Sequence, residues 1–192
     1  MKGIELLKKL QQLHKPFYTI ADLEKISGLS RNSLYVALSR WTANGLVERM
    51  AQGIYCPLGV DFSVERTAAQ LYLPNYLSFE SALSRHGVLN LIPYSLTFAT
   101  TRKTRKYSIQ GHNVEFRKIA SELFFGFTME GGICLASPEK AFLDELYLVS
   151  RGKTQLDMEE IDLKKLKLKK LKALARPYPA YVQRFLQKIV RL

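Results

Sequence analysis

The chain is poor in the residues that build metal centres and disulfide frameworks. Its 192 residues include two cysteines and three histidines. The cysteines, Cys56 and Cys134, lie far apart in apolar runs, which excludes a disulfide framework and favours a reduced, cytoplasmic setting. The histidines, His14, His86 and His112, show no pair at metal-ligand spacing, so we expect neither a zinc site nor a cofactor.

Long apolar runs are missing as well. No uninterrupted apolar span approaches the ~20 residues that a membrane helix needs. The N-terminus, MKGIELLKKLQQLH, lacks the apolar centre of a signal peptide. Gly-rich phosphate loops and nucleophile elbows are also not found in the sequence. We therefore expect a soluble protein that is not an enzyme.

Acidic residues are in the minority. The chain has 29 Lys and Arg against 17 Asp and Glu, which gives a formal net charge of +12. A field of this sign attracts polyanions, so nucleic acid is the partner class that composition favours. The length fits one large domain or two small ones, and either can bury a core without disulfides.

Residues 19–45 have the pattern of two short helices joined by a tight turn. Thr19 and Asp22 fit a capping box that opens the first helix, and Gly28 ends it. Ser30 can cap the second helix, which we expect to end at the next glycine. An amphipathic helix at the N-terminus would complete a three-helix core.

Two strand-like runs, 46–50 and 53–56, follow at hairpin spacing. Together with the helices they give the outline of a winged helix-turn-helix, so DNA binding is the leading hypothesis. Gln52 would stand at the wing tip and meet the DNA backbone or the minor groove. The alternative is a small domain of the same outline that binds protein.

The second of these helices is the one expected to enter the major groove. At about 100° per residue its apolar positions fall on one core-facing stripe: Leu34, Ala37, Leu38 and Trp41. The opposite face is small or polar. Asn32 is the first candidate for a base contact, because Asn can pair with adenine through two hydrogen bonds. The other DNA-facing candidates are Arg31, Ser33, Tyr35, Ser39 and Arg40.

Beyond the wing, the pattern changes to strands followed by helices. We expect residues 1–58 to form the DNA-binding domain and residues 61–192 a mixed domain. Alternating runs predict a mainly antiparallel sheet, and Ser137 with Pro138 marks a strong helix start. The expected fold class is α+β, with an N-terminal winged helix-turn-helix, then a mixed domain with a mainly antiparallel sheet and C-terminal helices.

One dense cluster of basic residues in the second domain could contact phosphates, each contact steepening the salt dependence of binding. It consists of Arg102, Lys103, Arg105 and Lys106, between two strand candidates. A solvated hairpin loop is the alternative. The Lys-rich run 164–172 fits the solvent-facing side of an amphipathic helix better than a binding surface.

Four further charged residues lie together on the helix that begins at Pro138: Glu139, Lys140, Asp144 and Glu145. They could be imagined as an acid, a base and a cation. Their spacings of four and five residues fit surface ion pairs equally well, and Glu139 would compensate the helix dipole. We therefore expect no catalysis from them.

The second domain could also be an interaction module for a protein, an RNA or a second copy of the chain. Its aromatic residues could stack on bases. Most of them, however, alternate with polar residues or lie in apolar runs, as buried strand faces do, so core packing is the predicted use.

The winged start and three later runs together resemble the AbiEi family. The later runs are YLSFESALSRHGVLNLIPYSLTFATTRKTRKY, FFGF and ASPEKAFLDELYL. The AbiEi proteins are the antitoxins of type IV toxin-antitoxin systems linked to abortive phage infection. The resemblance covers nearly the whole chain. It implies a winged domain that represses its own operon at promoter repeats, and a second domain that counteracts a nucleotidyltransferase toxin without a stable complex.

The resemblance transfers no set of residues onto the second domain. The chain is shorter than many members of the family, so an orphan nucleic-acid- or protein-binding module without a cognate toxin remains the alternative. Palindromic operators would require dimers or side-by-side monomers.

Overall fold

The computed structural model describes residues 3–60 and 63–190. Its contacts divide the chain into two compact units, Met1–Thr67 with Ser108–Gly111, and Ala68–Tyr107 with His112–Leu192. We call them the first and the second unit. The predicted domain boundary falls partly on residues 61–62, which lie outside the described residues, so it stays a prediction.

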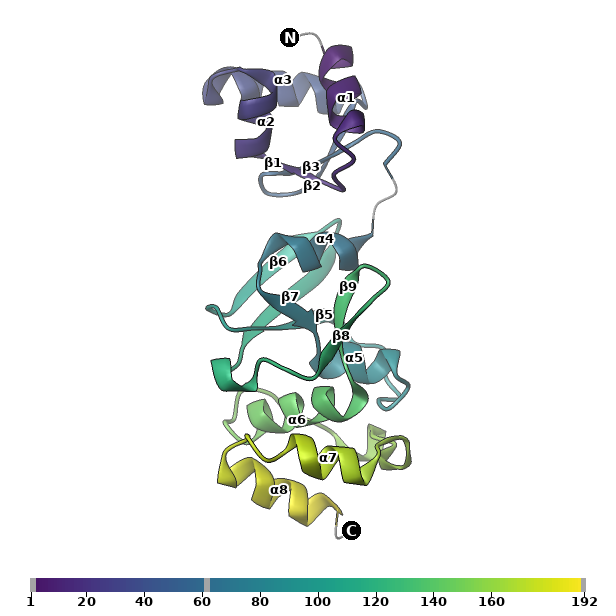
Figure 1. Cartoon of the computed structure of the whole chain (residues 1–192). Coiled ribbons are helices and arrows are strands. Elements are labelled where there is room, and N and C mark those ends of the chain that lie inside the picture. Colours follow the sequence, from purple (N-terminus) through teal and green to yellow (C-terminus); the bar gives the residue numbers. More distant parts are fainter. Residues whose placement is uncertain (1–2, 61–62, 191–192) are drawn as a thin grey trace. The chain divides into compact units, whose positions relative to one another are not determined.

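The first unit packs helices against a small sheet (Figure 1). The helices are α1 (Gly3–Gln12), α2 (Ile20–Ser27) and α3 (Arg31–Ala43). The strands β1 (Tyr18–Thr19), β2 (Val47–Ala51) and β3 (Ile54–Pro57) form a sheet of order β1-β3-β2. Leu6, Leu23, Leu34 and Trp41 are buried together in the core of this unit. The winged helix-turn-helix outline is thus confirmed, and β1 is a strand that the sequence did not predict.

Local hydrogen bonds explain where these helices begin and end. The hydroxyl of Thr19 accepts from the backbone N–H of Asp22, whose carboxylate accepts from the N–H of Thr19, so the predicted capping box is confirmed. Gly28 ends α2 with φ 69°, a left-handed conformation that favours glycine. The prediction for Ser30 was wrong in one respect. It occupies the N-cap position of α3, but its hydroxyl bonds the Ser33 hydroxyl at 3.0 Å and, within the described chain, caps no backbone amide.

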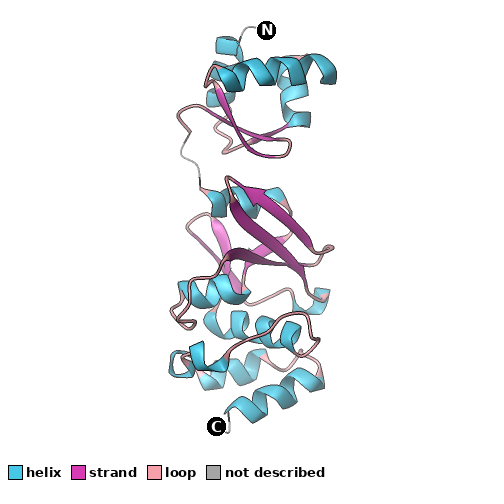
Figure 2. Cartoon of the chain, turned by 180° about the vertical axis from the view of Figure 1, so that it is seen from behind, coloured by secondary structure: helices cyan, strands magenta, loops and turns pink. Residues whose placement is uncertain are grey.

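The second unit is built on a mixed sheet of order β6-β7-β5-β4-β9-β8 (Figure 2). Its strands are β4 (Asn75–Leu77), β5 (Ser95–Thr100), β6 (Arg105–Ile109), β7 (His112–Lys118), β8 (Phe127–Glu130) and β9 (Ile133–Ala136). The pairs β4–β5 and β8–β9 are antiparallel, whereas β5–β7 and β4–β9 are parallel. The predicted fold class is confirmed. Alternation along single strands could not predict the two parallel pairs, because it carries no information on strand direction.

Helices complete the second unit. They are α4 (Val64–Leu71), which spans the division between the units, α5 (Phe79–Arg85), α6 (Pro138–Val149), α7 (Leu168–Leu174) and α8 (Ala180–Val190). α6 lies at the centre, in contact with α5, α7 and α8 (Figure 1). It starts as predicted, with the Ser137 hydroxyl accepting from the N–H of Lys140 and Pro138 in its first turn. Among the described residues, no helix combines the length and the apolar character that a membrane crossing requires.

Candidate nucleic-acid interface

Helix α3 is held by its apolar stripe, which the sequence predicted correctly. Leu34, Leu38 and Trp41 are buried against α2 and β2. All six DNA-facing candidates on this helix are exposed: Arg31, Asn32, Ser33, Tyr35, Ser39 and Arg40. Val36 is 61% exposed on the same helix. An exposed valine suits a groove-facing helix, because it can contact the methyl group of thymine.

The candidates divide over two sides of α3. Arg31 and Tyr35 line a hollow of about 440 Å³, together with Arg49 of β2 and Gln52. Gln52 stands in the turn between β2 and β3, as predicted. This hollow therefore joins the start of α3 to the wing. Tyr55 forms part of the lining.

Ser33 and Arg40 lie on the other side of the helix. They line a separate hollow of about 630 Å³ with Leu29 and Asn44. At about 100° per residue, Asn32 falls between the two sides, in the middle of the exposed face. The structure therefore does not gather all the predicted residues into one pocket. It spreads them over two sides of the exposed face of α3.

Arg49 is the residue that the sequence interpretation missed. It is exposed on β2 between the buried Val47 and Met50, and it lines the wing-side hollow. One feature of the sequence could have identified it: Arg49 is a basic residue three places before Gln52 at the wing tip. The bulge of β2 between Arg49 and Ala51 locally changes the register of the strand.

The electrostatics of this face favour an anion. The first turn of α3 contains no acidic side chain within its described residues, so the positive end of the helix dipole is not neutralised there. A hydrogen bond with the Tyr35 side chain, together with the charge of Glu24, raises the pKa of Arg31, whose guanidinium is fully charged in any case. With Arg49 across the hollow, two arginines face the same space.

The match to a known family covers this unit. Residues 5–57 match the AbiEi_4 family model, described as "Transcriptional regulator, AbiEi antitoxin". The N-terminal region is therefore similar to this family. The match begins in α1 and ends at the last residue of β3, so it contains α3 and the wing. It confirms the resemblance for this region and supports a DNA-binding regulator.

The chain was also compared with curated protein sequences and with solved structures. No curated protein sequence matches the chain. Among solved structures, the RV2827C protein from Mycobacterium tuberculosis matches with a TM-score of 0.64 and 11% sequence identity. The match covers 98% of this chain and 76% of that one. At this identity the likeness shows a shared fold for nearly the whole chain.

The basic cluster of the second unit is partly engaged with aromatic rings. Arg102 donates to the backbone oxygen of Leu73, and its guanidinium lies 4.7 Å from the ring of Tyr72. Arg105 lies 5.1 Å from the same ring and donates to the hydroxyl of Tyr107. All four basic residues, Lys103 and Lys106 included, are exposed. Arg105 and Lys106 belong to strand β6, so the predicted loop is shorter than expected.

Lys106 differs from the others because it has an acidic partner. It forms an ion pair with Glu115 of β7, which lies only 15% exposed beside it. Burial alone would raise the pKa of Glu115, but the bonds from Lys106 and Arg117 outweigh it and lower that pKa. Lys106 is therefore the least available of the four for a phosphate.

The charged residues of α6 are not the surface ion pairs that their spacing suggested. Lys140 and Asp144 are both 0% exposed, and the Lys140 Nζ lies 2.5 Å from an Asp144 oxygen. The same Nζ donates to the backbone oxygen of Leu123 at 2.7 Å and to the Tyr178 hydroxyl at 2.6 Å. The ring of Phe125 lies 4.6 Å from it. Every direction around the ammonium group is thus filled by oxygen or by an aromatic face.

The carboxylate of Asp144 is equally surrounded. It accepts from the hydroxyls of Tyr76 at 2.7 Å, Ser78 at 2.8 Å and Tyr178 at 2.7 Å. Ser78 occupies the N-cap position of α5, but its hydroxyl bonds Asp144 and, in the described structure, caps no backbone amide. Burial lowers the pKa of Lys140, and the charge of Asp144 opposes that shift. Closed to solvent, this cluster ties α6 to β4 and to the segment before α8.

Proposed function

We propose that this protein is a cytoplasmic, sequence-specific DNA-binding regulator that represses its own operon as a type IV antitoxin. The observation that carries the proposal is the exposed face of α3 beside the wing, where Arg31, Tyr35, Arg49 and Gln52 line one hollow. The AbiEi match over residues 5–57 supports it. Binding would be noncovalent, without a cofactor and without catalysis.

The division of labour on α3 follows from the chemistry of its side chains. Asn32, in the middle of the exposed face, would read a base, because a side-chain amide can recognise adenine bidentately. Arg31 and Arg49, which line the same hollow, would contact phosphates on the wing side of the groove, together with the unneutralised N-terminus of α3. Arg40 would do the same on the opposite side of the helix. The repeats of an operator would be occupied by dimers or by side-by-side monomers.

The direct test is binding of the purified protein to its own upstream DNA and to random DNA, at two salt concentrations. The proposal predicts a preference for the upstream DNA that survives the higher salt, because base contacts add to the salt-sensitive phosphate term. Arg49→Ala should weaken binding to both DNAs and flatten the salt slope by about one unit. Lys9→Ala on α1 removes an exposed charge outside both hollows and should change less. Binding that is uniform and abolished by salt would contradict the proposal.

For the second unit, we propose that it counteracts a nucleotidyltransferase toxin by a contact that need not be stable. An exposed apolar loop before β5 favours a protein contact. Ile92 is 94% and Tyr94 is 91% exposed there, beside Leu91. Apolar side chains gathered in this way are typical of interaction surfaces.

The toxin proposal can be tested by growth. Cells that express a nucleotidyltransferase toxin from a neighbouring gene should grow when this chain is expressed with it. Ile92→Asp should reduce the rescue, whereas Met129→Asp, an equally apolar-to-acidic change at a 70% exposed position, should not. Absence of rescue by the unaltered chain would support the alternative, an orphan module without a cognate toxin.

A further inference from the structure

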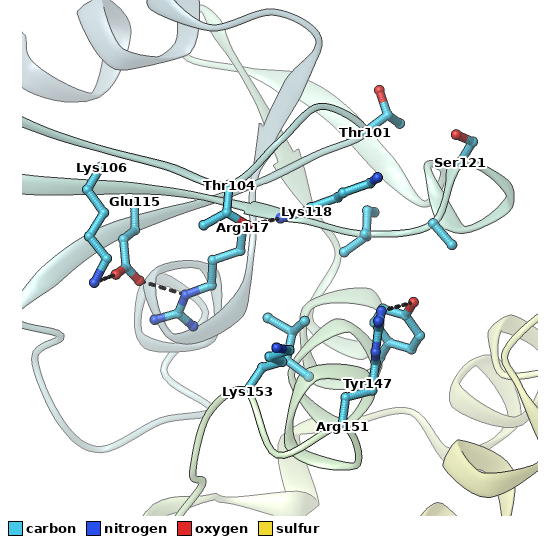
Figure 3. A pocket seen from close by; sticks show the side chains of 13 residues that line it. Thr101, Thr104, Lys106, Glu115, Arg117, Lys118, Ser121, Tyr147, Arg151 and Lys153 are labelled. Atoms are coloured by element: carbon cyan, nitrogen blue, oxygen red, sulfur yellow. Dashed lines mark hydrogen bonds and ion pairs between the residues drawn. The ribbon is translucent and has the colours of Figure 1, made fainter.

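A second basic feature of the second unit lies outside the proposed DNA interface. A pocket of about 690 Å³ opens between the end of β7 with the turn that follows it and the C-terminal end of α6 (Figure 3). Its size lies within the range of about 300–1,000 Å³ that is usual for small-molecule sites. The pocket is built entirely from residues of the second unit.

The inner charges of this pocket neutralise one another. Arg117 bonds both oxygens of Glu80, at 2.9 and 2.8 Å, and bonds Glu115 at 2.8 Å. Glu115 is also the partner of Lys106. Two cations and two carboxylates therefore balance. The nearby Glu145, 3.8 Å from Arg117, has its pKa raised to about 8 by burial and by the charge of Glu80, so it is mostly uncharged at pH 7.

Three further cations at the pocket have no such balance. Lys118, Arg151 and Lys153 line it, and none of them lies within ion-pair distance of a carboxylate in residues 3–60 or 63–190. All three are exposed, so no desolvation opposes their charges. The mouth of the pocket therefore holds about three unneutralised positive charges, brought from opposite walls.

Local contacts hold the side chain of Arg151 and the backbone of Lys153. Arg151 donates to the hydroxyl of Tyr147 at 2.7 Å, and its guanidinium lies 5.2 Å from that ring. The backbone N–H of Lys153 donates to Leu148 at 3.0 Å, which holds the turn after α6. Figure 3 shows Lys118 on the wall formed by the strand, facing the wall that carries Arg151 and Lys153.

A purely structural explanation covers only part of this arrangement. Cations near the C-terminus of a helix stabilise its dipole, which accounts for Arg151 and Lys153 at the end of α6. It does not account for Lys118, which comes from β7. Nor does it account for the hydroxyls of Thr101, Thr104 and Ser121, which also line the pocket and are suited to donate to phosphate oxygens.

We propose that this pocket binds a small phosphorylated molecule that carries at least two phosphate groups. The phosphates would lie between Lys118 on one wall and Arg151 and Lys153 on the other. Ammonium and guanidinium groups form the stronger, charge-assisted bonds to phosphate. The apolar part of the ligand would rest on Ile119 and Leu148, which line the same pocket. The proposal does not depend on DNA binding by α3.

The concave shape favours a small ligand over the backbone of a nucleic acid. A duplex presents its phosphates on a convex surface and is met by protruding side chains. Here the side chains line a concave, open pocket, and the buried Tyr147 forms part of its lining. Free phosphorylated molecules and nucleic acids would therefore give opposite results in the test below.

The experiment is calorimetric titration of the full chain with pyrophosphate, with adenosine triphosphate and with a short random DNA duplex, at constant ionic strength. We expect pyrophosphate and the nucleotide to bind with one-to-one stoichiometry. Lys118→Ala combined with Lys153→Ala should lower both affinities on the order of tenfold or more. Tighter binding of the nucleotide than of pyrophosphate would show that the apolar lining contacts the rest of the ligand. Equal affinities would show that the pocket contacts only the phosphate groups.

The control is Lys169→Ala combined with Lys172→Ala on α7, which removes the same charge from exposed positions outside the pocket. It should leave both affinities within about twofold. Three results would overturn the proposal. These are no binding of either ligand to the unaltered chain at millimolar concentration, equal losses in the pocket variant and the control, or a loss confined to the DNA duplex. Unchanged circular dichroism of all variants excludes misfolding as the cause.

Discussion

Replacing Lys140 by Met would leave the carboxylate of Asp144 buried without its cation. Both side chains are 0% exposed, and the ammonium group contributes one of the four hydrogen bonds that Asp144 accepts. Removing one partner of a buried pair costs about 3–5 kcal/mol, because the remaining charge cannot be hydrated. We therefore expect Lys140→Met to lower the free energy of unfolding of the second unit by about that amount.

The assay separates the two units by their optical signals. The chain has one tryptophan, Trp41, which lies in the core of the first unit. Its fluorescence during denaturation in urea reports that unit, whereas far-ultraviolet circular dichroism reports both. Lys140→Met should shift the circular dichroism transition to lower urea concentration and leave the fluorescence transition in place. Lys172→Met, at an exposed position on α7, should change stability by no more than about 0.5 kcal/mol.

A double variant tests whether the uncompensated charge of Asp144 causes the loss of stability. Lys140→Met combined with Asp144→Leu removes both charges, so part of the lost stability should return. The recovery should be incomplete, because the hydroxyls of Tyr76, Ser78 and Tyr178 would lose their acceptor. A loss below about 1 kcal/mol for Lys140→Met alone would refute the assignment of a buried, charged pair.

Three further predictions follow from single contacts. Ser137→Ala should destabilise the second unit by about 1 kcal/mol in urea denaturation, because it removes the cap of α6, whereas Ser30→Ala should cost only a few tenths because Ser30 caps no amide in the described structure. Equal effects of the two changes would contradict this. The pKa of Glu145, about 8 in the folded state against 4.5, means that its contribution to stability is full below pH 4.5 and is lost as the pH rises through 8. The difference between the unaltered chain and Glu145→Gln in unfolding free energy should therefore change over that window, and a constant difference would count against the raised pKa. Finally, Arg102→Ala should lower affinity for all DNA sequences and flatten the salt slope if its exposed guanidinium contacts phosphate, while an unchanged slope would leave it as a structural partner of Tyr72 and Leu73.

Features set by neighbouring residues could be predicted from the sequence. The capping box of Thr19 and Asp22, the left-handed Gly28 and the start of α6 at Ser137 each depend on bonds between residues no more than four positions apart. The buried stripe of α3 likewise follows from helical spacing, with Trp41 as its largest member. These local patterns were enough for the winged outline and for the exposed face of the reading helix.

Features that depend on distant contacts could not be predicted from the sequence. Ser30 and Ser78 have the same cap-like setting as Ser137, yet Ser78 bonds Asp144, 66 positions away. The spacing of Lys140 and Asp144 is typical of a surface pair, and only Tyr76 and Tyr178, from two other segments, show that it is buried. β4 has three residues, too few for any alternation to be recognised, although it lies in the middle of the sheet.

The same limit applies to the candidate interface. The exposed residues of α3 were predicted from angular position, but the hollow that joins Arg31 to Arg49 requires the wing to fold back beside the helix. In the sequence, Arg49 is one of 29 basic residues, and only its position three places before Gln52 sets it apart. Only the folded structure brings Arg49 into the same hollow as Arg31 and Tyr35.

If the exposed face of α3 reads a specific DNA sequence, the chain must prefer its own upstream DNA to random DNA, and the ratio of the two affinities measures that preference. This ratio should be measured for the unaltered chain and for Asn32→Ala at two salt concentrations. We expect Asn32→Ala to cost about 1–3 kcal/mol on the upstream DNA and much less on random DNA, so that the ratio falls at both salt concentrations. Equal losses on both DNAs, or no preference in the unaltered chain, would contradict it.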